Sequence, residues 1–197
     1  RVEKWLVDRM NGEEMVIDTA SLTSYKNEEF DLTQIDTNKP TALLSANVVW
    51  DLAALNKEVF TKSMADWIIE TINWFKQHPE YQLIVKSHPA EYFPGIPETK
   101  ETVISMIQKE FSEIPKNIFV LSAKVSSTVY DLLSLSSVGL VFTSSVGMEM
   151  AARGFPVISA GKSHYSGYGF IYNPSSQSEY FRILENCLSD KRDIERL

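Results

Sequence analysis

The sequence has a single cysteine, Cys187, and only three histidines among its 197 residues. One cysteine cannot build a disulfide framework or a cysteine-based zinc cluster, and it suits a reducing compartment. No apolar run approaches the roughly 18 residues that cross a bilayer, so no membrane span is predicted. The 19 basic residues are outnumbered by 26 acidic ones, which gives a formal net charge of −7. This balance argues against a nucleic-acid partner. Any phosphate that the protein binds must therefore be held by a few nearby groups and not by a broad basic surface.

Several well-known motifs are also missing. Gly161-Lys162-Ser163 suggests a phosphate-binding P-loop, but Pro156 stands where that motif requires its first glycine. No G-x-G-x-x-G follows the first apolar run, which removes the main support for a dinucleotide cofactor. No nucleophile elbow and no H-E-x-x-H appear, and the scattered histidines do not form a metal site. The sequence therefore predicts no cofactor and no metal.

The chain divides into two parts of different character. Residues 1–10 have the pattern of a short amphipathic helix that ends at Asn11-Gly12, and residues 18–40 are polar with weak periodicity. We predict a helix and connecting segment over residues 1–40 and one domain over residues 41–197. The chain opens on Arg1 rather than Met, which leads us to expect a piece of a longer protein with a second domain.

From residue 41 onward, short apolar runs alternate with segments of helical spacing. The runs are Ala42–Leu44, Leu83–Val85, Ile118–Leu121, Leu140–Phe142 and Val157–Ile158. Helices are predicted over Ser63–Lys76, Thr99–Phe111, Thr128–Leu135, Gly147–Arg153 and Tyr180–Leu188. This alternation predicts an α/β fold, a doubly wound parallel sheet of about five or more strands with helices on both faces. Ligands of such sheets bind beyond the carboxyl ends of the strands, so the residues just after each run are the candidates for function.

The second run is followed by Lys86, Ser87, His88 and Pro89. An ammonium and an imidazole N–H side by side suit a phosphate or diphosphate. The alternative is a rigid loop that carries a surface histidine, since Pro89 ends strand pairing in either case. His78-Pro79 serves as an internal comparison, because it follows a helix and precedes a strand. We predict that His78 lies at the opposite edge and only ends a helix.

The fourth run leads through Thr143-Ser144-Ser145-Val146-Gly147 into a helix. A serine hydroxyl and free backbone N–H groups at a helix start can hold an anion, and Gly147 allows close backbone approach. Simple helix capping by Ser144 or Ser145 explains the same residues. Glu149 in the first turn is favoured by the helix dipole, or it binds two ribose hydroxyls.

Two further turns reach the same predicted edge. The third run is followed by a hydroxyl-rich segment, Ser122–Ser127, across which a nucleobase could lie. The fifth run is followed by Gly161–Gly169, a glycine-containing loop with aromatic residues of the kind that often contacts a substrate.

Taken in order, these segments make residues 41–174 resemble the nucleotide-sugar-binding half of a GT-B glycosyltransferase. The resemblance is to the capsule polysaccharide biosynthesis family, which includes Kdo transferases and is related to bacterial sialyltransferases. The motifs that carry it are Lys86-x-His88-Pro89, Ser126-x-x-x-Tyr130, Ser144-Ser145-x-Gly147-x-Glu149, Gly154-x-Pro156-Val157 and Gly161…Tyr165…Gly167-x-Gly169.

The resemblance implies a role for each motif. His88, with Lys86 and Pro89 in its motif, and the Ser144-Ser145-x-Gly147 turn would hold the phosphate of an activated sugar such as a CMP-linked one. Glu149 would contact the ribose, Ser126 would face the base, and Tyr165 and Gly167 would border the sugar. No catalytic residue is assigned, because this class supplies its acid or base from a second domain.

The resemblance therefore implies a donor-binding domain that acts in surface polysaccharide synthesis with a nucleotide-sugar donor and a saccharide or lipid-linked acceptor. It implies a cytoplasmic protein, with peripheral association at the inner membrane face. The alternatives are a sugar-nucleotide epimerase or glycerophosphotransferase of similar fold, and a non-catalytic nucleotide-binding module. Fold alone does not choose among them.

Overall fold

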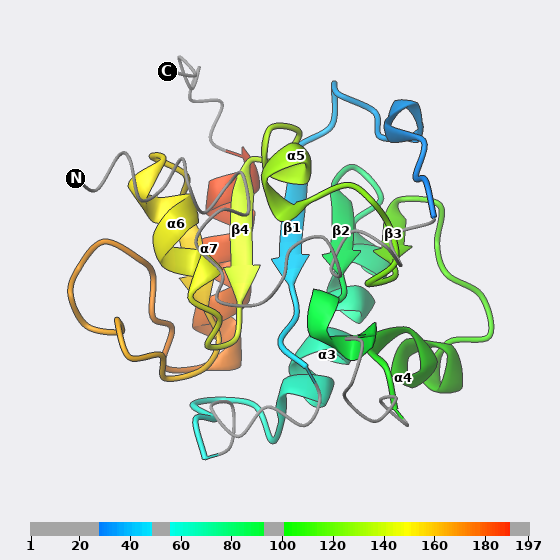
Figure 1. Cartoon of the computed structure of the whole chain (residues 1–197). Helices are drawn as coiled ribbons and strands as arrows, with labels where there is room; N and C mark the ends of the chain where they lie inside the picture. The colour runs from blue at the N-terminus through cyan, green and yellow to red at the C-terminus, as the bar shows by residue number, and fades with distance from the viewer. Residues whose placement is uncertain (1–27, 49–55, 93–100, 190–197) are drawn as a thin grey trace, which may run out of the picture.

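The computed structural model describes residues 28–48, 56–92 and 101–189, and its centre is a parallel sheet (Figure 1). The five strands lie in the order β3-β2-β1-β4-β5, and every neighbouring pair is parallel. They are β1 (Thr41–Ser45), β2 (Gln82–Lys86), β3 (Ile118–Leu121), β4 (Val138–Val141) and β5 (Val157–Ser159). Each predicted apolar run coincides with a strand, and the predicted α/β fold class is confirmed.

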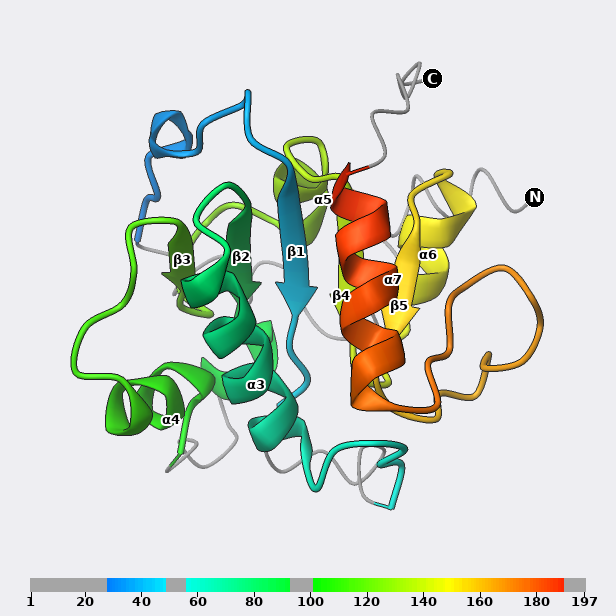
Figure 2. The same cartoon turned by 180° about the vertical axis from the view of Figure 1, so that it is seen from behind.

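Helices cover both faces of the sheet. Helices α5 and α6 lie in front of it in Figure 1, and α3, α4 and α7 cover the face seen in Figure 2. The α-helices are α3 (Met64–Gln77), α4 (Val103–Glu110), α5 (Val129–Leu133), α6 (Val146–Ala152) and α7 (Gln177–Ser189), and the short 3-10 turns are η1 (Leu32–Gln34) and η3 (Pro89–Tyr92). All five helices predicted beyond residue 41 are present, with boundaries that differ by a few residues. The helix predicted over residues 1–10 lies outside the described residues.

The strands are buried on both faces because helices cover each side. In β1, Ala42 and Leu44 pack in the cluster under α3, α4 and α7, whereas Leu43 points to the cluster under α5 and α6. All five residues of β1 are buried. This explains why the strands read as continuous apolar runs rather than as alternating ones.

Local capping fixes where several helices begin. The Ser63 side chain accepts a hydrogen bond from the backbone N–H of Asp66 at the start of α3. Thr102 and Thr128 each begin a helix with a capping box, completed by Ser105 and Asp131. These caps satisfy backbone N–H groups that the first helical turn leaves unpaired.

The described part of the first forty residues packs against the sheet. Glu28 forms an isolated parallel bridge with Val125, and the Ser126 N–H donates to the Glu28 carbonyl at 2.9 Å. Ile35 is buried in the same cluster as Leu43. The boundary between a segment 1–40 and a domain 41–197 stays a prediction. Within the ranges that the structure describes, no helix has the length and apolar character needed to cross a membrane.

Candidate functional site

The carboxyl ends of the strands meet at one edge of the sheet, which is the lower edge in Figure 1. Because the strand order is β3-β2-β1-β4-β5, the turn at 122–126 comes first along this edge. The segment 86–88 follows, then Asn47, then the turn at 143–147, and finally the loop from residue 160. The segments that carry the predicted site residues therefore share one edge, while β1 separates the His88 segment from the Ser144 turn.

Lys86 is almost completely buried at the end of β2, with 3% of its surface exposed. Its Nζ donates to the carbonyl oxygens of Ser122 at 2.8 Å and Val125 at 3.1 Å. Charge-assisted hydrogen bonds of this kind are stronger than neutral ones. The Lys86 ammonium therefore holds the turn that follows β3 against the end of β2. Because Val125 directly precedes Ser126, this contact also fixes the position of Ser126.

His88 is oriented by its own turn. Its Nδ1 accepts a hydrogen bond from the Ala90 N–H at 3.1 Å, so the neutral ring carries its proton on Nε2. Pro89, which has no N–H to pair, starts η3 directly after it. His78 lies at the opposite edge as the C-cap of α3, and its ring stacks on Trp74 with centroids 3.9 Å apart. The prediction that the two His-Pro pairs lie at opposite edges is confirmed.

Glu91 is a buried carboxyl group near this turn that the sequence did not reveal. It is 2% exposed, and its Oε1 accepts a hydrogen bond from the Val103 N–H at 2.8 Å. Burial raises the pKa of Glu91, and the bond from Val103 opposes that shift. The carboxyl group thus fastens the turn that contains His88 to the start of α4.

The strand order reverses between the parallel strands β1 and β4, because β2 and β3 lie on one side of β1 and β4 and β5 lie on the other. Asn47 joins the ends of β1 and β4 there. The Asn47 Nδ2 donates to Thr143 Oγ1 at 3.3 Å, and the Thr143 N–H donates to Asn47 Oδ1 at 3.4 Å. Both residues are buried. Such a switch point is where open α/β sheets form a ligand crevice, and this pair lies at that point.

The turn after β4 is held by Tyr165 from the loop after β5. Tyr165 is 2% exposed, and its hydroxyl donates to the carbonyl oxygen of Ser144. Burial raises the pKa of Tyr165 to about 12. A β-carbon on Gly147 would collide with the Tyr165 hydroxyl and approach Val141 Cγ2 to 3.0 Å. Gly147 is therefore required for the packing of Tyr165 against this turn.

Glu149 is buried in α6 and is linked to α5. Tyr130 donates its hydroxyl hydrogen to Glu149 Oε2, and the guanidinium of Arg153 lies over the Tyr130 ring, 4.6 Å from its centroid. The motifs that contain Ser126 and Tyr130 on one side and Glu149 on the other are thus joined by a direct hydrogen bond. Sequence spacing alone gave no sign of this contact.

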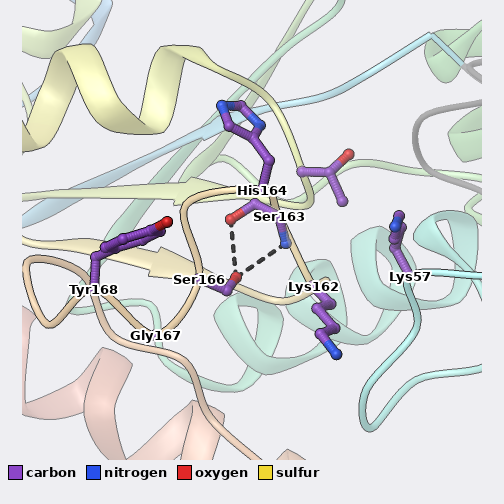
Figure 3. A pocket seen from close by; sticks show the side chains of 8 residues that line it. Lys57, Lys162, Ser163, His164, Ser166, Gly167 and Tyr168 are labelled. Atoms are coloured by element: carbon purple, nitrogen blue, oxygen red, sulfur yellow. Dashed lines mark hydrogen bonds between the residues drawn. The ribbon is translucent and has the colours of Figure 1, made fainter.

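A hollow of about 800 Å³ opens at the β4 and β5 end of the edge (Figure 3). Its lining combines two ammonium groups, an imidazole, hydroxyl groups and an exposed tyrosine: Lys57, Thr143, Lys162, Ser163, His164, Ser166, Gly167 and Tyr168. The Lys162 N–H donates to the Lys57 carbonyl at 2.7 Å, which joins the segment before α3 to the loop after β5. The Ser166 Oγ accepts from the Ser163 N–H at 3.0 Å and so shapes this loop.

Of the predicted site residues, Gly167 lines the hollow directly and has a positive φ of 86°. Ser144 and Ser145 follow Thr143, which also lines it. The structure does not bring Lys86, His88 or Ser126 into this hollow. Lysine 57 has no motif around it in the sequence, so only the fold reveals its place there. In the described part of the chain, no three His, Cys, Asp or Glu residues group so as to hold a metal ion.

A family model described as "Capsule polysaccharide biosynthesis protein" matches residues 21–183 of the chain. A search among curated proteins found no match.

Solved structures support the fold assignment. One is a beta Kdo 2,4 transferase, KpsC of Thermosulfurimonas dismutans, with a TM-score of 0.52, 17% identity, and coverage of 90% of this chain and 55% of that one. Another is the UDP-GlcNAc 2-epimerase of Neisseria meningitidis bound to UDP-GlcNAc, with a TM-score of 0.53, 13% identity, and coverage of 92% and 42%. The chain spans about half the length of these structures. Identities this low establish the shared Rossmann-like fold alone.

Proposed function

The chain belongs to the capsule polysaccharide biosynthesis family, and from this premise we propose that it binds a nucleotide-activated sugar as the donor half of a GT-B glycosyltransferase. The observation that carries the proposal is the hollow of about 800 Å³ lined by Lys57, Lys162, His164 and four residues with hydroxyl groups. Its size lies within the range of about 300–1,000 Å³ that is usual for small-molecule sites. Its position at the carboxyl edge is where this fold holds ligands.

The donor groups in the hollow suit a phosphate-linked sugar. Lys57 and Lys162 supply positive charge in a protein whose net charge is −7. Thr143, Ser163 and Ser166 supply hydroxyl groups that bind phosphate oxygens or sugar hydroxyls. An anion is therefore attracted to this part of the edge by local groups and not by the overall field.

The remaining predicted contacts lie further along the edge. Neighbouring strands are about 4.8 Å apart, so the ends of β2 and β4 are separated by roughly 10 Å across β1. A nucleoside phosphate linked to a sugar is long enough to cover that distance. We therefore retain His88, Ser144 and Glu149 as proposed contacts to phosphate and ribose, and Ser126 as a contact to the base. A CMP-linked sugar is the first donor to test.

In the proposed transfer, an acceptor hydroxyl oxygen forms a bond to the anomeric carbon of the sugar. The bond between that carbon and the phosphate oxygen breaks, and the electron pair leaves with the nucleotide. Positive groups at this edge stabilise the charge that develops on the departing phosphate. The proton of the acceptor hydroxyl passes to a base on the second domain, which is part of the proposal together with a free or lipid-linked saccharide acceptor at the inner membrane face.

Nucleotide binding is the direct test. Thermal unfolding with CMP, CDP, UDP and GDP should show a stabilisation of about 2–3 kcal/mol at 100 times the dissociation constant of the preferred nucleotide. His88→Ala should weaken binding about tenfold, and the matched His78→Ala should leave it unchanged, because His78 lies at the opposite edge. Equal effects of the two substitutions, or no response to any nucleotide, would contradict the proposal.

The hollow itself can be tested with a matched lysine pair. Lys162→Ala should weaken the binding of nucleotide sugars, since it removes a positive charge from the hollow. Lys109→Ala is the control, because Lys109 is exposed on α4 and pairs with Glu101 at 2.6 Å. If both substitutions change the affinity equally, the effect is one of net charge and the hollow is not the site.

A sugar-nucleotide epimerase is the second candidate, because the epimerase structure superposes as well as the transferase does, with TM-scores of 0.53 and 0.52. An epimerase inverts one sugar carbon without an acceptor. Incubation of the chain with UDP-GlcNAc, followed by separation of the sugars, distinguishes the two. A sugar inverted at C2 that forms without acceptor supports the epimerase and contradicts the transferase, whereas GlcNAc of unchanged configuration reflects hydrolysis of the donor.

A further inference from the structure

A second hollow, of about 470 Å³, lies at the amino edge of the sheet, the upper edge in Figure 1. Its lining comes from the segment before β1, the end of α3 and the starts of β2 and β3. The residues are Gln34, Asp36, Lys39, Lys76, Pro79, Gln82, Pro115, Lys116 and Asn117. No motif in the sequence pointed to it, and the proposed nucleotide-sugar site lies beyond the other ends of the strands.

Gln82 is the buried polar residue of this hollow. It is the first residue of β2 and is only 4% exposed. Its Oε1 has no hydrogen-bond partner among the described residues. Leaving a buried carbonyl-type oxygen unpaired costs about 1–3 kcal/mol, so such groups normally find a donor. Because Gln82 lines the hollow, a flip of its side-chain amide can present this oxygen to a hydroxyl donor bound there.

The charges around the hollow favour an anion. Lys39, Lys76 and Lys116 contribute three ammonium groups, and Asp36 contributes one carboxylate. Hydrogen bonds from the backbone and side chain of Asn38 lower the pKa of Asp36, so this carboxylate is ionised. Its Oδ1 already accepts both of these bonds from within its own turn. The local balance is positive although the whole chain carries −7.

Three carbonyl groups of the segments around the hollow, which would repel an anion, are already hydrogen-bonded. Asn117 Nδ2 donates to the carbonyl oxygens of Phe75 at 2.9 Å and Tyr81 at 3.0 Å. Lys39 Nζ donates to the carbonyl oxygen of Pro79 at 2.9 Å. Of these bonds, the one to Phe75 satisfies a carbonyl oxygen at the negative end of the α3 dipole, next to Lys76. In the described part of the chain, Lys76 and Lys116 make no hydrogen bond or ion pair of their own, so both remain available to a ligand.

We propose that the hollow formed by Gln82, Lys76 and Lys116 is a second binding site that takes a sugar bearing a carboxylate or a phosphate. The acidic group pairs with the lysine ammoniums, and a sugar hydroxyl donates to Gln82 Oε1. A single water does not account for the site, because it occupies about 30 Å³ and brings no charge. An inorganic anion accounts for the lysines but fills only a small part of a hollow of about 470 Å³.

The site is separate from the proposed nucleotide-sugar site. Strands of about five residues place the two edges roughly 16 Å apart. One sugar cannot occupy both hollows, so the second site holds another molecule or another part of a saccharide chain. The presence or absence of nucleotide binding at the carboxyl edge therefore does not decide whether an acidic sugar binds at the amino edge.

Calorimetric titration of the chain with glucose 6-phosphate, glucuronate, glucose and inorganic phosphate tests the site. We expect both acidic sugars, or one of them, to bind at least tenfold more tightly than glucose and inorganic phosphate, and the comparison of the two shows whether phosphate or carboxylate is the natural group. Equal affinity for inorganic phosphate and the sugar phosphate would mean an adventitious ion only and would overturn the proposal, as would the absence of binding.

Variants then locate the site. The double substitution Lys76→Ala and Lys116→Ala should reduce acidic-sugar affinity at least tenfold, whereas Lys162→Ala at the other edge and Lys109→Ala on α4 should not. Gln82→Leu should weaken the acidic sugar but leave the weak binding of inorganic phosphate unchanged. If Gln82→Leu does not fold, the lysine variants decide alone, because their side chains lie at the surface. Loss of binding in Lys162→Ala instead would assign the acidic sugar to the nucleotide-sugar hollow and overturn the inference.

Discussion

The hydroxyl of Tyr165 donates a hydrogen bond to the carbonyl oxygen of Ser144. This bond joins the loop after β5 to the turn after β4, and these two segments border the hollow at the carboxyl edge. A tyrosine that was expected to face a ligand is instead 2% exposed. Its role in the structure is to hold one wall of the candidate site against the other, while its contact with a sugar stays a prediction.

Tyr165→Phe should reduce stability by about 1 kcal/mol, since it removes one hydrogen bond while the Ser144 carbonyl keeps the bond from the Gly147 N–H at 3.1 Å. Its effect should also depend on pH. The pKa of Tyr165 is raised to about 12 in the folded chain, so its contribution is complete below the ordinary value of 10 and is lost as the pH rises toward 12. Chemical unfolding at pH 8 and pH 11 should show a smaller decline in Tyr165→Phe than in the unaltered chain. An equal decline in both would contradict the assignment.

Gly147→Ala should destabilise the chain by about 1–3 kcal/mol, because the new methyl group overlaps the Tyr165 hydroxyl. The double variant with Tyr165→Phe removes that oxygen and should recover part of the loss. Thermal unfolding of the two single variants and the double variant gives the coupling between them. Strictly additive effects would show that the two side chains do not meet.

Lys86→Met should destabilise the chain by about 2–3 kcal/mol. The substitution keeps an unbranched side chain in the buried position but removes the donor to the Ser122 and Val125 carbonyl oxygens. Proteolysis within residues 122–126 should become faster as this turn loses its support. Lys124→Met in the same turn is the control. An unchanged midpoint of unfolding for Lys86→Met would mean that the ammonium is dispensable.

Glu91→Gln should change how stability depends on pH. Burial raises the pKa of Glu91, so ionising this group is harder in the folded chain than in the unfolded one. Its stabilising contribution is therefore present below the unfolded pKa and is lost as the pH rises through the folded value. Glutamine keeps an oxygen for the Val103 N–H and never ionises. The stability of Glu91→Gln relative to the unaltered chain should increase from pH 4 to pH 7, and a flat difference would contradict this account.

The sheet and its helices could be predicted because each carries its own local signal. Apolar runs such as Leu83–Val85 are long enough for a strand that is buried on both faces, and Ser63 marks the start of α3. The order of the strands across the sheet cannot be predicted from any one segment of the sequence. It results from which faces pack together, so the central position of β1 became visible only in the structure.

The sequence was enough to predict at which edge of the sheet the candidate site lies, but not which way its side chains point or which residues they contact. Placing His88 and Ser144 at the carboxyl ends of strands follows from a parallel sheet. The inward direction of Lys86 does not follow, because a lysine after an apolar run reads as a surface residue until its carbonyl partners are known. Contacts such as that between Tyr130 and Glu149 join residues 19 positions apart on different helices, and no periodicity records them.

The central place of β1 has a mechanical consequence. It is hydrogen-bonded to β2 on one side and to β4 on the other, so its five residues join the two halves of the sheet. A ligand that contacts both His88 and the Ser144 turn would bind on both sides of β1 and restrain the motion of the two halves of the sheet relative to each other. Ligand binding would therefore slow the deuterium exchange of the β1 amides, although the ligand would contact none of them.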